Sequence, residues 1–230
     1  MPDNLRARIL DVESEVDAGR YKPGPWAKIL DELRNRPDEE RAALADDLTR
    51  TSDKLHLRNN PKRIGLTAAI GLELIATAIG GVLLARGLGN RSLLLTIAGA
   101  LIWISTFQPL VKIAIGTTLG VGYSYAYLYG LEPRFKMRYG SYLAAPRWAR
   151  VTLHLSGMAG SPLAAAIVWA TARGAMPLAS LICAILFWML VATNLVQFIA
   201  GLAGLKRLGL PVRLGSGGAA GIELREALGR

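Results

Sequence analysis

Residues Gly130–Ala164 have the sequence GLEPRFKMRYGSYLAAPRWARVTLHLSGMAGSPLA, and they join two strongly apolar segments of the chain. The stretch contains the densest run of positive charge in the second half of the chain: Arg134, Lys136, Arg138, Arg147 and Arg150. Lys and Arg collect in the cytoplasmic loops of membrane proteins. The stretch therefore predicts an inner loop between two transmembrane helices.

The composition also indicates a membrane protein. Hydrophobic residues make up 52% of the 230 residues and fall in long blocks. Residues 1–63 carry equal numbers of basic and acidic residues, so the net charge of +10 comes entirely from the rest of the chain. Because that excess flanks the apolar blocks, membrane topology explains it, and a nucleic-acid partner is not expected. The lipid bilayer is the expected partner.

Three regions are predicted along the chain. Residues 1–60 form a soluble helical region, 61–205 a polytopic transmembrane domain, and 206–230 a basic tail that ends in a short, loosely held helix. Helical spacing of apolar residues predicts three helices in the first region, the last running from Pro37 to about Leu57. His56 is expected to be solvated at the end of this third helix. The region is interpreted as a small cap or as a docking module.

The predicted fold is an all-α membrane protein with about four transmembrane helices. The spans are placed at 64–85, 92–130, 151–171 and 177–203, each long enough to cross about 30 Å of hydrocarbon. Charge favours a single crossing in the second span, broken or extended near Pro109, because the two most basic segments, the 131–150 loop and the tail after Gly204, then face the cytoplasm. The alternative is two crossings that meet at Pro109, which gives five spans. Both termini are expected to be cytoplasmic, with the protein in the plasma (inner) membrane.

Aromatic residues near the inner loop predict a belt at the inner membrane surface. The belt would contain Tyr123, Tyr125, Tyr127, Tyr129, Tyr139, Tyr142 and Trp148. Tyr and Trp are enriched at this depth because their rings are amphipathic.

Few polar residues lie inside the predicted spans, and they are the first candidates for a site. They are Glu73, Lys112, His154, Asn194 and Gln197. Ionisable groups at this depth are costly and must face protein or water. We expect structural hydrogen bonds between helices, and the alternative is a polar path across the membrane. The sequence lacks HExxH, CxxC, GxSxG and a Walker loop, so no catalytic residue, metal ligand set or cofactor is expected.

Blocks in the second half of the chain share their order with a known family. Within PRWARVTLHLSGMAGSPLAAAIVW (146–169), Gly160 and Pro162 belong to AGSPLA, which resembles an LAGPLAN-like block with one serine inserted. Phe135–Tyr142 resembles the GGY hairpin that precedes it, and Asn194-Leu195 resembles the start of a downstream Asn-containing block. Residues 109–204 therefore resemble the core of the site-2 proteases, the intramembrane zinc metalloproteases.

The resemblance implies a pseudoprotease. The family's HExGH motif would fall on TTLGV, of which only Gly120 is kept. Thr117 and Val121 stand where the histidine ligands would be, and Thr118 stands at the catalytic glutamate. Leu202-Ala203 stands where the aspartate ligand would be. Without these groups water cannot be activated on zinc in the family's way, so the resemblance implies a fold that binds a transmembrane helix without cutting it.

Three functions remain open at this stage. One is a non-catalytic membrane protein that binds or regulates another membrane protein, or a second copy of itself. Another is a small transporter or channel subunit that uses Glu73, Lys112, Asn194 and Gln197 along a polar path. The last is a membrane enzyme built on Glu132, His154 and the basic loop, acting on an anionic lipid.

Overall fold

The computed structural model describes residues 2–34, 36–59, 62–129, 132–205 and 215–228. The chain forms two compact units. The membrane unit comprises Thr67–Gly116 and Arg147–Arg230. The other, here called the flanking unit, comprises Met1–Leu66 and Thr117–Pro146, the segments that come directly before the first span and after the second.

Four long apolar helices define the protein as membrane-embedded. They are α5 (Leu66–Gly89), α6 (Leu93–Thr118), α8 (Arg147–Ala172) and α9 (Pro177–Leu202). Each has 24 or 26 residues, enough to cross the hydrocarbon core with some tilt. The predicted fold class is confirmed. Residues 93–118 form one helix that continues through Pro109, so the second span is a single crossing.

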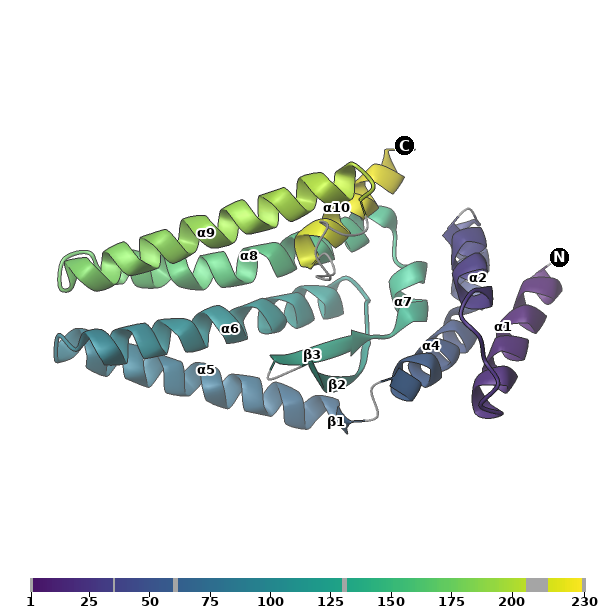
Figure 1. Cartoon of the computed structure of the whole chain (residues 1–230), viewed down its shortest axis with the longest axis horizontal. Coiled ribbons are helices and arrows are strands. Elements are labelled where there is room, and N and C mark those ends of the chain that lie inside the picture. Colours follow the sequence, from purple (N-terminus) through teal and green to yellow (C-terminus); the bar gives the residue numbers. More distant parts are fainter. Residues whose placement is uncertain (1, 35, 60–61, 130–131, 206–214, 229–230) are drawn as a thin grey trace. The chain divides into compact units, whose positions relative to one another are not determined.

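Helices α5 and α6 run side by side as an antiparallel pair (Figure 1). The Thr77 hydroxyl lies 2.8 Å from that of Thr106, and Trp103 Nε1 donates to the Thr77 carbonyl at 2.9 Å. Glycines allow the backbones to approach closely, because a Cβ added at Gly99 would lie only 2.7 Å from the Gly80 carbonyl oxygen. Small residues and hydroxyl hydrogen bonds therefore set the register of this pair.

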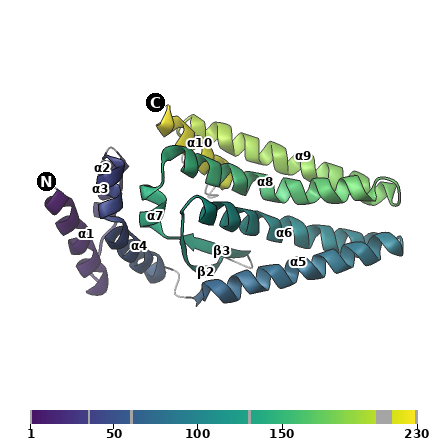
Figure 2. The same cartoon turned by 180° about the vertical axis from the view of Figure 1, so that it is seen from behind.

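Helix α10 (Ser216–Ala227) lies against the first turns of α8, which carry Arg147 and Arg150, and against the last turns of α9 (Figures 1 and 2). It meets α9 through glycine: an added Cβ at Gly221 would overlap the Phe198 carbonyl oxygen, and one at Gly201 would overlap the Gly218 carbonyl oxygen. The expectation of a loosely held terminal helix is wrong, because α10 is packed backbone to backbone against a span.

The flanking unit is built mainly from short helices. They are α1 (Pro2–Asp17), α2 (Pro25–Arg34), α3 (Asp38–Ala43), α4 (Ala45–Asn59) and α7 (Tyr139–Ala144). Leu5, Ile9 and Val12 lie on one face of α1 and are at most 3% exposed, as are Leu33 and Leu48 of the neighbouring helices. The third predicted helix is in fact two, because the backbone leaves the helical conformation at Leu44 between α3 and α4.

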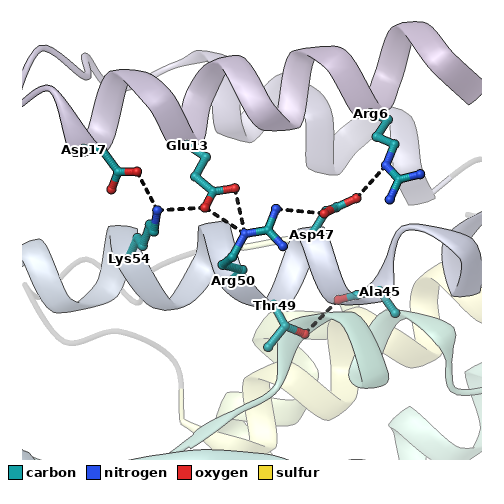
Figure 3. A network of polar contacts seen from close by, with 8 residues as sticks. All are labelled: Arg6, Glu13, Asp17, Ala45, Asp47, Thr49, Arg50 and Lys54. Carbon is teal, nitrogen blue, oxygen red and sulfur yellow. Dashed lines mark hydrogen bonds and ion pairs between the residues drawn. The ribbon is translucent and has the colours of Figure 1, made fainter.

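A row of ion pairs joins α1 to α4 beside this core (Figure 3). Arg50 Nε lies 2.7 Å from Glu13 Oε1, and Arg50 Nη2 lies 2.8 Å from Asp47 Oδ1. Lys54 Nζ bridges Glu13 and Asp17 at 2.7 and 2.5 Å. The ion pairs at this helix interface therefore join six charged residues: Arg6, Glu13, Asp17, Asp47, Arg50 and Lys54.

The flanking unit also contains a three-stranded antiparallel sheet that the sequence analysis missed. Its strands are β1 (Arg63–Ile64), β2 (Tyr123–Tyr129) and β3 (Glu132–Met137), in the order β1-β2-β3. Arg63 pairs with Tyr127, and Ile64 with Ala126. Because β1 directly precedes α5 and β2 follows α6, the chain enters the first span and leaves the second span from the same sheet.

Three local predictions are wrong for this reason. The second span ends at Thr118, where Gly120 turns the chain with a positive φ of 78°, and does not continue to Gly130. Tyr123 and Tyr125 are each only 6% exposed within the sheet, so they do not belong to a lipid-facing belt. His56 is partly buried rather than solvated, since its Nδ1 lies 3.0 Å from the Tyr125 hydroxyl.

Candidate functional site

The predicted polar residues of the spans gather partly around the first turn of α10. A Cβ added at Gly157 of α8 would lie 2.7 Å from Ser216 Oγ and 3.3 Å from Lys112 Cδ. Gln197 Oε1 accepts a hydrogen bond from the Gly215 N–H at 2.8 Å. Lys112 and Gln197 therefore converge on the segment where α10 begins.

Two further predicted residues contribute to the same helix group. Asn194 Nδ2 donates to the Met158 carbonyl at 3.2 Å and so links α9 to α8. His154 is 5% exposed, and its ring is close enough to Lys112 and Arg150 to interact with their positive charges. One helical turn below it, Arg150 forms an ion pair with Glu223 of α10 at 2.9 Å, with side chains only 3% and 11% exposed. This pair fixes α10 to α8.

Glu73 lies on α5. It is 5% exposed, and its backbone carbonyl accepts the Thr77 hydroxyl at 2.8 Å. Of the residues proposed for a polar path, the structure thus brings Lys112 and Gln197 together and places Asn194 at the neighbouring α8–α9 contact.

The positions matched to the family motifs have structural roles where the structure describes contacts. A Cβ at Gly160 would lie 2.6 Å from Gln108 Cα, so α8 touches the α6 backbone there. The Ser161 hydroxyl donates to the Ile104 carbonyl at 2.6 Å, and Pro162 is buried inside α8. These residues form a helix–helix contact.

The residues at the motif's catalytic positions belong to the flanking unit. Thr117 and Thr118 are the last residues of α6, and Gly120 forms the turn that follows. Val121 is fully buried and apolar. Among the described residues no three side chains of His, Cys, Asp or Glu lie close enough together to bind one metal ion.

The flanking unit has a polar cavity of about 480 Å³ between α4, the sheet and the start of α7. Its wall includes Arg50 and Asp53 of α4, Arg63 of β1, Ser124 of β2 and Arg138, which precedes α7. The Arg50 guanidinium already donates hydrogen bonds to Glu13 and Asp47. Arg63 and Arg138 make no side-chain hydrogen bond or ion pair with other described residues. The Ser124 hydroxyl is buried and also lacks a hydrogen-bond partner in the described chain.

The surroundings of this cavity change the ionisation of nearby groups. Burial raises the pKa of Tyr125 to about 12, and the charge of Asp53 adds to this rise. Burial lowers the pKa of Lys136 despite its contact with Asp53 at 3.7 Å. At neutral pH Tyr125 therefore carries its proton and acts as a neutral hydroxyl beside the arginines.

Sequence reasoning missed this cavity because its residues are far apart in the chain. In the sequence Arg138 belongs to the basic loop, whereas Arg63 lies 75 residues earlier, before the first span. The alternation of tyrosine with other residues from Tyr123 to Tyr129 is the period-two signal of a strand and was the available clue.

Comparisons of the chain with protein-family models, curated proteins and solved structures found no match.

Proposed function

We propose that this chain is a non-catalytic multi-pass membrane protein, similar to an inactive site-2 protease, that binds or regulates another membrane protein. The observation that carries the proposal is the contact of Gly160 with the backbone of Gln108, together with the buried Pro162. It makes the AGSPLA block a helix-packing element, as expected of a retained family core. The antiparallel β2–β3 hairpin that precedes α8 supports the same order of elements.

The non-catalytic half of the proposal rests on residue chemistry. Zinc proteolysis needs ligands and a general base, and Thr117, Thr118 and Val121 supply neither an imidazole nor a carboxylate. Polar side chains of the spans link helices in the hydrogen bond of Asn194 and the ion pair of Arg150. What remains for function is binding through the helix surfaces.

The proposed location is the plasma (inner) membrane with both termini in the cytoplasm. Four spans put the two termini on one side, and the pairing of β1 with β2 is consistent with this arrangement. The basic residues Arg134, Lys136, Arg138, Arg147 and Arg150 favour the cytoplasm for that side.

The binding half is tested by photo-crosslinking in cells. A crosslinking amino acid in place of Leu163, which belongs to the AGSPLA block and is 49% exposed, should trap one membrane protein or a second copy of the chain. The matched position is Leu94, which is 78% exposed at the start of α6 and should trap lipid only. Protein adducts that are equally diverse at both positions, or absent from both, contradict the proposal.

The non-catalytic half is tested by metal content. Purified protein should contain less than about 0.1 zinc per chain, since a bound structural or catalytic zinc requires three or four protein ligands. Stoichiometric zinc that is lost in a His154→Ala variant would overturn this half and leave the binding half to the crosslinking result.

A transporter or channel subunit is the second candidate, favoured by the convergence of Lys112 and Gln197 on the start of α10. Flux of ions or small solutes through proteoliposomes that is abolished by Lys112→Met would favour it. Flux equal to that of empty liposomes would exclude it.

A further inference from the structure

The cavity of the flanking unit contains positively charged side chains and hydrogen-bond donors that have no partner among the described residues. Arg63 and Arg138 both lie on its wall, and neither guanidinium is paired within the described residues. The Ser124 hydroxyl adds a buried donor without a partner. Arg side chains in such an arrangement match the tetrahedral oxygens of phosphate, which they bind through forked hydrogen bonds.

Two carboxylates share the wall of the cavity and limit what it can bind. Asp46 and Asp53 line it, and Asp53 is already compensated in part by Lys136 at 3.7 Å. Arg50, which also lines it, is neutralised by Glu13 and Asp47. The charged groups of the wall without an ion pair among the described residues are therefore the cations Arg63 and Arg138 and the carboxylate Asp46. The carboxylates are suitable acceptors for hydroxyl groups on a phosphorylated ligand.

Short segments of the chain connect residues of this cavity to the ends of two spans. Arg63 precedes Leu66, the first residue of the first span, by three residues. Three extended residues cover at most about 10 Å, so Arg63 cannot lie farther than this from the start of α5. Ser124 follows the end of α6 at Thr118 by only six residues. A cavity built from these two segments is within reach of phospholipid head groups.

We propose that this cavity binds the phosphate of a hydroxyl-bearing phosphate ester, with Arg63 and Arg138 as its cationic ligands and Ser124 as a neutral donor. The ester is either the head group of an anionic lipid such as phosphatidylglycerol or a free phosphorylated polyol. Binding of this ligand does not depend on whether the membrane unit binds another protein.

The experiment is native mass spectrometry of the full-length protein purified in detergent. Dioctanoyl-phosphatidylglycerol is titrated, with dioctanoylglycerol as the phosphate-free control and sn-glycerol 3-phosphate as the soluble competitor. One bound phosphatidylglycerol per chain is expected, and none of the phosphate-free lipid. The R63Q/R138Q variant should bind at least about tenfold more weakly, because each arginine supplies a charge-assisted hydrogen bond.

A matched variant separates the cavity from general surface charge. K62Q/R134Q removes the same charge from the same unit, at exposed residues outside the cavity wall, and should bind within about twofold of the unchanged protein. R63K/R138K keeps both charges but loses the forked geometry, so it should bind better than R63Q/R138Q and worse than the unchanged protein. Thermal melting of each variant establishes that it is folded.

The outcomes are distinct. Competition by glycerol 3-phosphate supports the cavity with a soluble ligand, and its absence supports the cavity with a lipid ligand. No binding of either ligand overturns the proposal, as does an equal loss in R63Q/R138Q and K62Q/R134Q. None of these results bears on the crosslinking at Leu163, so the two proposals succeed or fail separately.

Discussion

Glu13 is the residue on which the ion-pair row between α1 and α4 depends. Its carboxylate receives Arg50 Nε at 2.7 and 2.9 Å and Lys54 Nζ at 2.7 Å, while its own side chain is only 11% exposed (Figure 3). The hydrogen bond from Arg50 holds the pKa of Glu13 below its usual range, although burial opposes this. Glu13 thus stabilises the fold as an anion.

A Glu13→Gln substitution should lower the free energy of unfolding by about 1 kcal/mol, the usual contribution of one partly buried charged hydrogen bond. Because the folded-state pKa is lowered, this stability is present above about pH 4.5 and is lost as the pH falls through the folded pKa. Thermal melting at pH 7 measures the loss. Glu15→Gln on the same helix is the control, and an equal effect of both substitutions would contradict the role given to Glu13.

His56 has the opposite charge preference. Burial lowers its pKa, Lys136 adds to this lowering, and Asp53 opposes it. Its ring contacts the Tyr125 hydroxyl at 3.0 Å and the Tyr127 ring at a centroid distance of 4.3 Å. The imidazole is therefore expected to be neutral in the folded unit at neutral pH.

The stability of the flanking unit should consequently depend on pH through His56. The unfolded histidine titrates at about pH 6.5 and the folded one at lower pH, so the stabilisation is complete above about 6.5 and declines as the pH falls below it. Melting temperatures between pH 7.5 and 5.5 should fall for the unchanged protein and stay flatter for His56→Gln. Identical slopes in the two proteins would show that other groups control the dependence.

At the scale of elements, α10 shows how glycine can attach a short helix to a span. Gly221 and Gly217 are four residues apart and so share one face of α10, where they meet the backbone of α9. An added methyl group at Gly221 would overlap the Phe198 carbonyl and lie 2.6 Å from the Leu202 nitrogen. Backbone atoms cannot yield as a flexible side chain can.

Gly221→Ala should therefore release α10 while leaving the four spans folded. A loss of about 1.4 kcal/mol in docking would raise the rate of protease cleavage within residues 215–228 about tenfold. Gly174→Ala is the matched control, because nothing lies within 4 Å of the added atom and its φ is not positive. Unchanged cleavage in the Gly221 variant would mean that α10 is attached chiefly by the Arg150–Glu223 pair.

The elements that the sequence could predict are those decided by length and apolarity. The four spans follow from long apolar runs, and the distribution of charge favoured one crossing over two within residues 92–130. The sheet was missed because the tyrosines at 123–129 extend an apolar run without a break, which hid their period of two. The phosphate-binding cavity was not predictable, because Arg63, Ser124 and Arg138 become neighbours only when β1 pairs with β2.

For the whole molecule, the pairing of β1 with β2 is a constraint on topology. Both strands adjoin spans, so the start of α5 and the end of α6 must be on one side of the membrane. Two further spans, α8 and α9, then return the chain to that side. The arrangement requires an even number of crossings, whereas the alternative of five spans requires the termini to lie on opposite sides.

Cysteine labelling distinguishes these arrangements in intact cells. In a Cys183→Ala background, which removes the single native thiol, an impermeant maleimide should label Asn90→Cys in the loop between α5 and α6. Glu39→Cys and Leu228→Cys should react only after the membrane is permeabilised, because both termini are proposed to be cytoplasmic. Labelling of Leu228→Cys but not Glu39→Cys in intact cells would require an odd number of spans. Reaction of both, with Asn90→Cys protected, would keep the four spans and invert their orientation.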